Sequence, residues 1–255
     1  MKPNRLLLSL LMPAALVLLS NCTTPSKTAN KATTKLVGAT DARDDYAVVD
    51  ANDPLEPLNR ATFWLNDGIY NVVLRPISKS YEFITPAPVR QGINNVFDNA
   101  AFPVRFVNSA LQGKFKRAGQ EVQKFGVNTF AGFGGLIKQS DRIPSLTNVP
   151  REDTGQTLAK WGVRHGPYLV LPILGPSSAR DVFGIGGDYA LNPVNWLFAL
   201  KGDADDFAWI PPSANTLRQL PDQLKKYDES RANALDPYLS IRSTYYQNRQ
   251  SAADE

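Results

Sequence analysis

The spacing of hydrophobic residues predicts a mainly α-helical fold that begins near Asp53. A first helix is indicated by an apolar stripe that repeats about every 3.6 residues. The residues of this stripe are Leu58, Ala61, Leu65, Ile69, Val72 and Val73. Phe63 and Trp64 make the stripe broader than the core face of an ordinary helix. Because proline disfavours helical geometry in the residue before it, we expect Pro76 to end this helix.

Two more helices follow with the same period. Pro88 suits the first turn of a helix, and the apolar positions after it are Val89, Ile93, Val96, Phe97 and Ala100. Pro103 is expected to break or kink this helix, and the apolar pattern then continues to Gly113, a candidate C-cap. The apolar residues of the third helix are Phe115, Ala118, Val122 and Phe125.

The pattern becomes irregular after the third helix. An irregular stretch extends through Trp161 to the apolar run Pro167–Leu174, whose prolines argue against a long central strand. Helical patterns return around residues 194–200, 214–224 and 238–246. Neither an internal repeat nor a second domain is indicated. After Cys22 no apolar run reaches the roughly 18 residues of a membrane-spanning helix.

The N-terminus has the pattern of a bacterial lipoprotein signal peptide over residues 1–21. Lys2 and Arg5 supply positive charge, and the apolar stretch after them is too short to span a membrane comfortably. Residues 19–22, with the sequence LSNC, resemble a lipobox. One departure is Asn21, which stands where Gly, Ala or Ser is usual.

The lipobox predicts that Cys22 carries the lipid. The alternative is a buried free thiol, a common fate of cysteine, but no packed element is indicated around this residue. Thr23 follows in place of the aspartate that retains lipoproteins in the inner membrane of enteric-type bacteria. We therefore expect a protein anchored by lipid to the periplasmic face of the outer membrane.

Composition divides the remainder of the chain and excludes some functions. Residues 22–51 are rich in Thr, Ala, Lys and Asp, which predicts a lipidated flexible tether. The helical domain is assigned to residues 52–249 and a tail to residues 250–255. Without Lys2 and Arg5 the chain has 26 basic and 24 acidic residues, too even a balance for a nucleic-acid-binding surface. A single cysteine excludes an intramolecular disulfide, and a single histidine leaves little room for a His-based metal site.

Two short motifs suggest chemistry and are weak. Residues 183–188 (FGIGGD) lack the lysine and the strand–turn–helix context of a phosphate loop, so these glycines are expected to permit close backbone approach. Residues 175–179 (GPSSA) approach the nucleophile elbow of hydrolases, but Ala179 replaces the final glycine. His165 precedes these serines, against the hydrolase order, and is expected to be a hydrogen-bonding turn residue.

Two charged groups were also considered as ligand sites. Asp203, Asp205 and Asp206 lack the spacing of a calcium loop and predict a solvated acidic loop. A small basic face either meets lipid headgroups or is simply solvated, the second being favoured. Its residues are Lys114, Lys116 and Arg117.

The chain resembles the MlaA family of lipoproteins, also called VacJ-like, over residues 52 to about 249. Its matching motifs, in order, are NDPLEPLNR (52–60) with Phe63 and Asn66-Asp67, PAPVR (86–90), NSALQG (108–113), Asn128-Thr129, GQTL (155–158), WGV (161–163), GPYLVLP (166–172), GPSS (175–178), Arg180-Asp181, and DPY (236–238) with Arg242. One departure is Thr154, where the family usually has Phe before Gly-Gln.

The resemblance implies a ring-like assembly of amphipathic helices that lies in one membrane leaflet. Its central channel would pass phospholipid from the outer leaflet of the outer membrane to the periplasmic carrier MlaC, which maintains lipid asymmetry. Trimeric outer-membrane porins are the membrane partners that it implies. No cofactor and no catalytic residue are expected. The alternatives are a lipolytic enzyme that uses Ser177 or Ser178 with His165, and a purely structural lipoprotein.

A moving element is also predicted. Gly132, Gly134 and Gly135 permit backbone angles that other residues resist, so they form a candidate hinge for a lid over the channel. A static helix end followed by a surface loop explains the same glycines. Periodicity does not separate a stripe that faces lipid from one that faces a core, so no channel-lining residue is named.

Overall fold

A computed structural model describes residues 53–196, 210–232 and 234–254. The signal peptide, Cys22, the tether, the predicted helical residues 197–200 and the acidic loop at Asp203, Asp205 and Asp206 lie outside these residues. The described chain is mainly α-helical, as the hydrophobic pattern predicts.

The first helix does not end at Pro76. It runs through α2 (Glu56–Ile69), a π-helical turn η2 (Tyr70–Leu74) and α3 (Arg75–Ile84). The prediction is wrong because Pro76 occupies the first turn of α3, directly after η2. Proline is tolerated in a first turn, where its missing N–H would have no partner in an ordinary helix either. The arm of the molecule is therefore about twice as long as α2 alone.

The next three helices confirm the predicted boundaries. These are α4 (Ala87–Ala100), α5 (Phe102–Leu111) and α6 (Phe115–Phe130). The break falls just before Pro103, and Gly113 has a φ of 75°, as a glycine C-cap requires. Phe102 and Phe125 stack with ring centroids 4.6 Å apart, which joins α5 to α6.

The stretch predicted as irregular contains three short helices. They are η3 (Gln139–Arg142), α7 (Pro144–Thr147) and α8 (Thr154–Lys160). The prediction missed α8 because the helix is only seven residues long and carries no clear apolar stripe. Its N-terminus is nevertheless signalled by a capping box, in which Asp153 and Gln156 satisfy each other's backbone N–H groups.

A short hairpin follows. Strands β1 (Tyr168–Leu171) and β2 (Gly175–Ser178) pair antiparallel, with Tyr168 opposite Ser178 and Leu171 opposite Gly175. The absence of a long strand agrees with the expectation from Pro167 and Pro172.

Helix α9 (Ala179–Leu191) begins directly after the hairpin, with Ser178 as its N-cap. Gly184 lies in α9, and a Cβ built on it would be 2.6 Å from the Gly155 nitrogen of α8. The prediction that this glycine permits close backbone approach is confirmed.

The chain ends with η4 (Pro193–Asn195), α10 (Ile210–Arg231) and α11 (Pro237–Asp254). Helix α11 includes residues 250–254, which the sequence assigned to a tail, so the folded part extends further than expected. Among the described helices, none combines the length and the apolar composition needed to cross a membrane.

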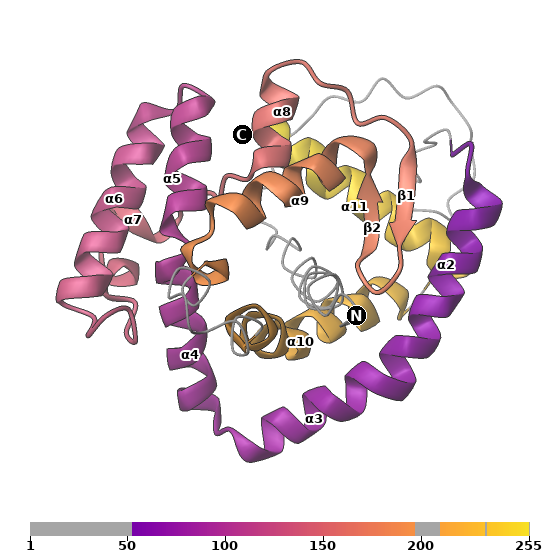
Figure 1. The fold of residues 1–255 in the computed structure, drawn as a ribbon, viewed down its shortest axis with the longest axis horizontal. Helices are drawn as coiled ribbons and strands as arrows, with labels where there is room; N and C mark the ends of the chain where they lie inside the picture. Colours follow the sequence, from indigo (N-terminus) through magenta and orange to yellow (C-terminus); the bar gives the residue numbers. More distant parts are fainter. Residues whose placement is uncertain (1–52, 197–209, 233, 255) are drawn as a thin grey trace, which may run out of the picture.

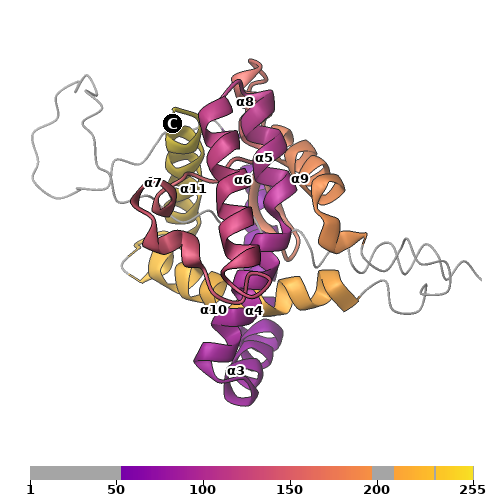
Figure 2. The ribbon, with the colours of Figure 1, turned by 90° about the vertical axis from the view of Figure 1, so that its left-hand side faces the viewer.

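The elements are arranged as a ring (Figure 1). The arm α2–η2–α3 runs along one side, α4 turns upward on the other, and α9 with the hairpin completes the circuit. Helices α5, α6 and α7 lie outside the ring beside α4, α10 lies within the ring, and α11 runs behind the hairpin (Figure 1). In the perpendicular view, α3 projects below the body of the molecule (Figure 2).

The hydrophobic core is small and lies where α2, the hairpin and α11 meet. Its buried residues are Phe63, Tyr168, Val170, Tyr238 and Ile241. The Asp53 carboxylate accepts hydrogen bonds from the Tyr238 hydroxyl and the Asn59 amide. The start of the folded domain is thereby fixed against α11.

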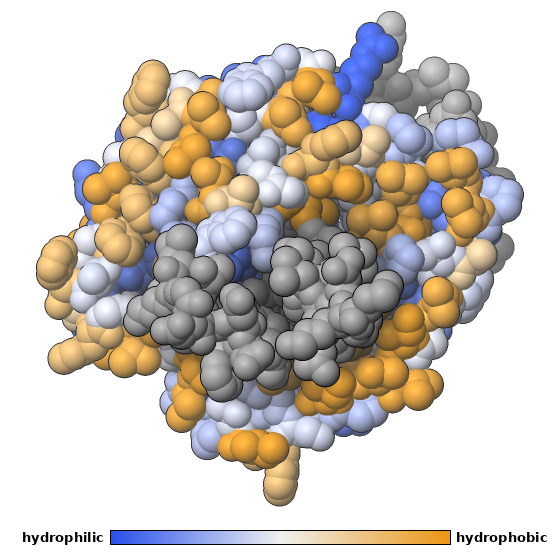
Figure 3. All heavy atoms as spheres, in the orientation of Figure 1, coloured by the Kyte–Doolittle hydropathy of each residue, from blue (hydrophilic) through white to orange (hydrophobic). Residues whose placement is uncertain are grey.

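The apolar stripe of the arm faces outward. Leu58 is 62% exposed and Val72 is 75% exposed, whereas Asn59 and Asn66 are buried at 1% and 2%. Further along the arm Phe83 is 93% exposed. Hydrophobic side chains gather along this edge of the molecule (Figure 3). The breadth of the stripe in the sequence is explained by two apolar faces: Phe63 and Tyr70 face inward and the remainder face out.

Candidate functional site

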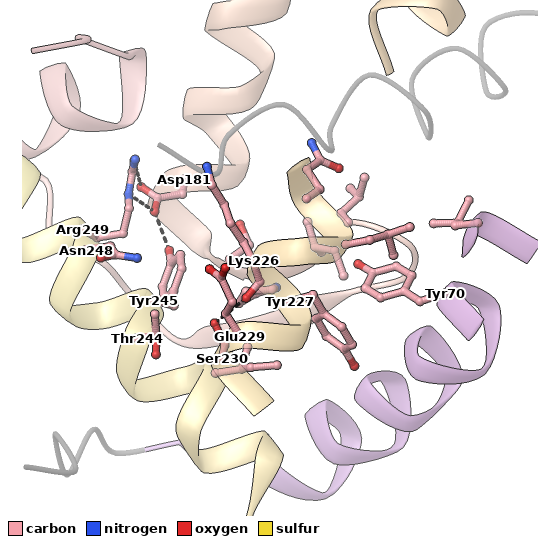
Figure 4. Close-up of a pocket in the computed structure, with 18 of the residues that line it drawn as sticks. Tyr70, Asp181, Lys226, Tyr227, Glu229, Ser230, Thr244, Tyr245, Asn248 and Arg249 are labelled. Carbon is pink, nitrogen blue, oxygen red and sulfur yellow. Dashed lines mark hydrogen bonds and ion pairs between the residues drawn. The ribbon is translucent and has the colours of Figure 1, made fainter. Parts of the chain in front are cut away.

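A cavity of about 460 Å³ lies on the inner side of the ring. It is enclosed by η2, the β1–β2 hairpin, α9, α10 and α11 (Figure 4). The volume is within the range of small-molecule binding sites in proteins. This cavity is the candidate site because elements from both ends of the chain contribute to it.

Most of the cavity wall is apolar. The aliphatic residues that line it are Leu74, Leu171, Leu174, Pro176, Ile185, Leu220, Leu224 and Ile241. Tyr70 and Tyr227 complete this wall, with their rings edge to face and centroids 4.9 Å apart. Burial raises the pKa of Tyr227, which keeps its hydroxyl neutral. The wall therefore favours hydrocarbon.

One end of the cavity is polar and rigid. Arg249 of α11 binds two buried carboxylates: its Nη1 lies 2.7 Å from Asp153 Oδ2, and its Nη2 lies 2.8 Å from Asp181 Oδ1. The Tyr245 hydroxyl donates a hydrogen bond to Asp181 (Figure 4). Because these groups satisfy one another, this end offers fixed charges at little reorganisation cost.

The charges at this end stay ionised. Burial by itself would raise the pKa of Asp181, but the Arg249 guanidinium and the hydrogen bonds from Arg249 and Tyr245 outweigh it and lower that pKa. Burial would lower the pKa of Arg249, and the neighbouring carboxylates of Asp153 and Asp181 raise it instead. Asp181 also pairs with the buried Arg180, whose Nε lies 3.2 Å from Asp181 Oδ1, so Asp181 has a guanidinium on two sides.

A second group of polar side chains lines the cavity from α10 and α11. Lys226, Glu229 and Ser230 come from α10, and Thr244 and Asn248 come from α11. Lys226 lies between Glu229 and the Asp181–Arg249 pair in the close-up (Figure 4). The cavity is therefore amphipathic, with hydrocarbon on one wall and both signs of charge on the other.

Helix α2 holds the hairpin by side-chain amides. Asn59 donates to the Tyr168 carbonyl at 3.0 Å and accepts from the Val170 N–H at 2.8 Å. Asn66, two turns later, donates to the Leu171 carbonyl at 2.8 Å and accepts from the Ile173 N–H at 2.6 Å. Each amide pairs with β1 as a third strand would. We name this pair of asparagines the amide ladder.

In the described chain, the His165 Nδ1 atom makes no hydrogen bond to Ser177 or Ser178. Ser178 is buried and caps α9, where it accepts the Asp181 N–H at 3.2 Å. Ser177 is also buried. His165 Nδ1 is buried without a partner, and only its carbonyl accepts a hydrogen bond, from the Arg180 N–H. The hydrogen bond expected of His165 is made by its backbone carbonyl, whereas its ring packs against Tyr246.

Comparison with known proteins decides the family. A family model described as MlaA lipoprotein matches residues 51–252, almost the whole described region. This chain belongs to the MlaA lipoprotein family. It is 30% identical to the intermembrane phospholipid transport system lipoprotein MlaA of Haemophilus influenzae over 219 residues, covering 84% of each chain. The Escherichia coli protein of the same description is 30% identical over 224 residues, covering 87% of this chain and 86% of its own.

Two further comparisons agree with this family assignment. A Rickettsia bellii protein without an assigned function is 33% identical over 201 residues, covering 78% of this chain and 76% of its own. A solved structure from work on the structural basis for maintenance of bacterial outer membrane lipid asymmetry superimposes with a TM-score of 0.61 at 30% identity. It covers 80% of this chain and 100% of its own. The ring-like helical fold expected from the resemblance is confirmed.

Thr154, the departure from the usual MlaA pattern, occupies a polar cluster. Its hydroxyl donates to Asp188 Oδ1 at 2.7 Å and its N–H donates to the same oxygen at 2.8 Å. Asn108 Nδ2 lies 3.2 Å from the Thr154 hydroxyl. Burial and the neighbouring Asp153 raise the pKa of Asp188 to about 7. Thr154 is thus held by polar contacts and is not among the residues that line the cavity.

The basic face next to Gly113 is neither free for headgroups nor simply solvated. Lys114 Nζ lies 2.9 Å from Glu152 Oε1, and Arg117 pairs with the same carboxylate. Glu152 is buried, so these cations compensate an interior charge. Only Lys116 of the three is fully exposed.

The glycine cluster follows α6 in a hydrogen-bonded turn. The Gly134 and Gly135 N–H groups donate to Thr129 and Asn128 carbonyls at 2.9 Å. Gly132 and Gly135 lie against other atoms, since an added Cβ would be 2.1 Å from the Ile137 oxygen and 2.7 Å from Asn99 Cβ. Gly134 has a φ of 70° and open space around it. The hinge therefore stays a prediction, and Gly134 is its testable position.

Of the residues that line the cavity, the sequence marked only Ser177 as a candidate for chemistry, in the lipolytic alternative. A signal was present for the amide ladder, because Asn59 and Asn66 are seven residues apart and share one helical face. No local signal marks the Asp181–Arg249 pair, whose members are 68 residues apart. Polar residues on the face opposite an apolar stripe are ordinarily solvated, which is why the ladder was overlooked.

Proposed function

We propose that this protein is the outer-membrane lipoprotein of an intermembrane phospholipid transport system. It removes phospholipid from the outer leaflet of the outer membrane and passes it to a periplasmic carrier, MlaC, which maintains lipid asymmetry. The observation that carries the proposal is the amphipathic cavity inside a ring whose outer edge is apolar. The relatives from Haemophilus influenzae and Escherichia coli, both described as phospholipid transport lipoproteins, support it.

The cavity matches the two halves of a phospholipid. Leucine side chains and the Tyr70–Tyr227 pair suit acyl chains, while Lys226, Glu229 and the Asp181–Arg249 pair suit a charged headgroup.

The outer edge of the ring suits the hydrocarbon side of a leaflet. The outward residues of the arm, among them Leu58, Val72, Phe83 and Ile84, form an amphipathic surface rather than a spanning segment. Such a surface lies in the interface plane with its apolar face a few ångströms below the headgroups. Lipid on Cys22, the tether of residues 22–51 and a trimeric porin partner would hold the ring at the periplasmic face of the outer membrane.

The decisive experiment measures transfer and hydrolysis together. Vesicles carrying the purified lipoprotein and labelled phospholipid are incubated with the purified periplasmic carrier. We expect intact labelled phospholipid on the carrier and no released fatty acid. Fatty-acid release that disappears in Ser177→Ala or Ser178→Ala would support the lipolytic alternative. Absence of both transfer and release would leave only the structural role.

A further inference from the structure

The turn between β1 and β2 has a conformation that its sequence disfavours. Ile173 has a φ of 68°, in the left-handed region, which is a genuine outlier for a β-branched residue. Such strain persists only where surrounding contacts over-determine it, and it gathers at functional sites. Three residues near Ile173 line the cavity. They are Leu171, Leu174 and Pro176.

Three hydrogen bonds from the arm hold this turn. Asn66 of the amide ladder accepts from the Ile173 N–H at 2.6 Å and donates to the Leu171 carbonyl at 2.8 Å. The Tyr70 hydroxyl donates to the Ile173 carbonyl at 2.8 Å. Tyr70 opens the π-helical turn η2, a rare feature in helices that occurs frequently at functional sites. Two backbone irregularities, one on each element, therefore meet at a single cavity wall.

We propose that Asn66 and Tyr70 are positioning residues that set the apolar wall of the lipid pathway by holding the β1–β2 turn in its strained form. When the hydrogen bonds from Asn66 and Tyr70 break, Ile173 relaxes to negative φ. The apolar turn then moves into the cavity that it now borders. The role of the pair goes beyond joining α2 to the hairpin, which Asn59 also does. This inference rests on the proposed phospholipid transport.

The opposing effects can be compared. The strain at Ile173 shifts the equilibrium between the held and the relaxed turn toward the relaxed form by about fivefold to a hundredfold. Each hydrogen bond favours the held turn by about twofold to tenfold. At the middle of these ranges, three bonds outweigh the strain, whereas the one bond that remains without Asn66 does not. The balance predicts that Asn66→Ala releases the turn in most molecules.

Asn59→Ala is the matched control. Asn59 has the same side chain, lies on the same helix and makes two hydrogen bonds to the same strand. Its partners, Tyr168 and Val170, lie outside the turn, so its loss should cost stability without moving the cavity wall. For Tyr70 the control is Tyr238→Phe, because the Tyr238 hydroxyl donates to Asp53, outside the turn, and Tyr238 does not line the cavity.

The experiment compares full-length lipoproteins in vesicles made of labelled phosphatidylethanolamine, with transfer to the carrier expressed per folded molecule from a parallel melting curve. Asn66→Ala loses two hydrogen bonds and should transfer lipid about tenfold more slowly than the wild type. Tyr70→Phe loses one and should transfer lipid about threefold more slowly. Asn59→Ala and Tyr238→Phe should stay within about twofold of the wild type.

Rescue separates positioning from ordinary destabilisation. Glycine adopts a φ near 70° without strain, so Ile173→Gly should restore most of the transfer of Asn66→Ala, and by itself should leave transfer near the wild-type rate. Equal transfer by Asn66→Ala and Asn59→Ala, or no rescue by Ile173→Gly, overturns the positioning role. A wild type that transfers no lipid overturns the proposed function instead.

Discussion

Arg249 offers the sharpest test of the polar end of the cavity. Arg249→Met keeps an unbranched stem and removes the cation between Asp153 and Asp181. Both carboxylates are about 90% buried, with side-chain exposures of 10% and 8%. Removing one partner of a buried ion pair costs about 3–5 kcal/mol, because the remaining charge is uncompensated. We expect a loss of about 4 kcal/mol in the free energy of unfolding at neutral pH.

The loss should depend on pH. The pKa of Asp181 is lowered in the folded protein, so this carboxylate stabilises the fold above its unfolded pKa, and the contribution is lost as pH falls through the folded pKa. Without Arg249 the Asp181 carboxylate keeps only Arg180 and Tyr245 as partners, so its pKa rises above the wild-type value and the neutral acid is buried more easily. The difference in the free energy of unfolding between the wild type and Arg249→Met should therefore become smaller from pH 7 toward pH 4.

Urea unfolding of the detergent-solubilised lipoprotein, followed by fluorescence of its four tryptophans, measures both effects. Lys225→Met is the control, because Lys225 pairs with Glu229 at 3.9 Å while both side chains are mostly exposed. Exposed pairs of this kind contribute about 0–1 kcal/mol. The role assigned to Arg249 would be refuted by either of two results. One is a loss in the free energy of unfolding for Arg249→Met no larger than that of Lys225→Met, and the other is a difference from the wild type that does not change with pH.

Three further predictions concern other parts of the chain. Burial and Asp153 raise the pKa of Asp188 to about 7, so this group stabilises the fold below about pH 4 and its contribution is lost as pH rises through 7. The melting temperature of the wild type should therefore fall between pH 4 and pH 7, and Asp188→Asn should make this fall smaller. An equal fall in the variant would contradict the raised pKa of Asp188. Cys22→Ala should abolish labelling by palmitate, whereas a labelled variant rules out the anchor. Gly134→Ala adds a methyl group in open space at the cost of about 1–2 kcal/mol of left-handed strain. It should slow lipid transfer in folded protein if the hinge is real, and normal transfer would leave a static turn.

Local signals in the sequence predicted local structure well. The break before Pro103 and the cap at Gly113 were predicted because each depends on the conformational limits of one residue. Pro76 shows the limit of that reasoning, since whether a proline ends a helix depends on the turn before it. In this chain that turn is π-helical, which no residue type announces.

The direction that each helical face points could not be predicted. The stripe through Leu58 and Val72 has the period of a core face but is exposed, and the core face carries Asn59 and Asn66. Period alone is the same for a helix in water and one against lipid. The family resemblance predicted the ring, whereas the cavity depends on contacts between residues about a hundred positions apart, such as Asn66 and Ile173.

The outward apolar stripe has a consequence for biogenesis. A folded molecule that presents residues such as Val72 and Phe83 to water would adhere to other proteins, since large apolar patches on monomers act as contact sites. Passage through an aqueous compartment therefore requires an escort that covers the arm until the membrane does. Detergent or lipid that binds only the folded form stabilises it by mass action. The unfolding midpoint of this protein is accordingly a function of amphiphile concentration rather than a constant of the chain.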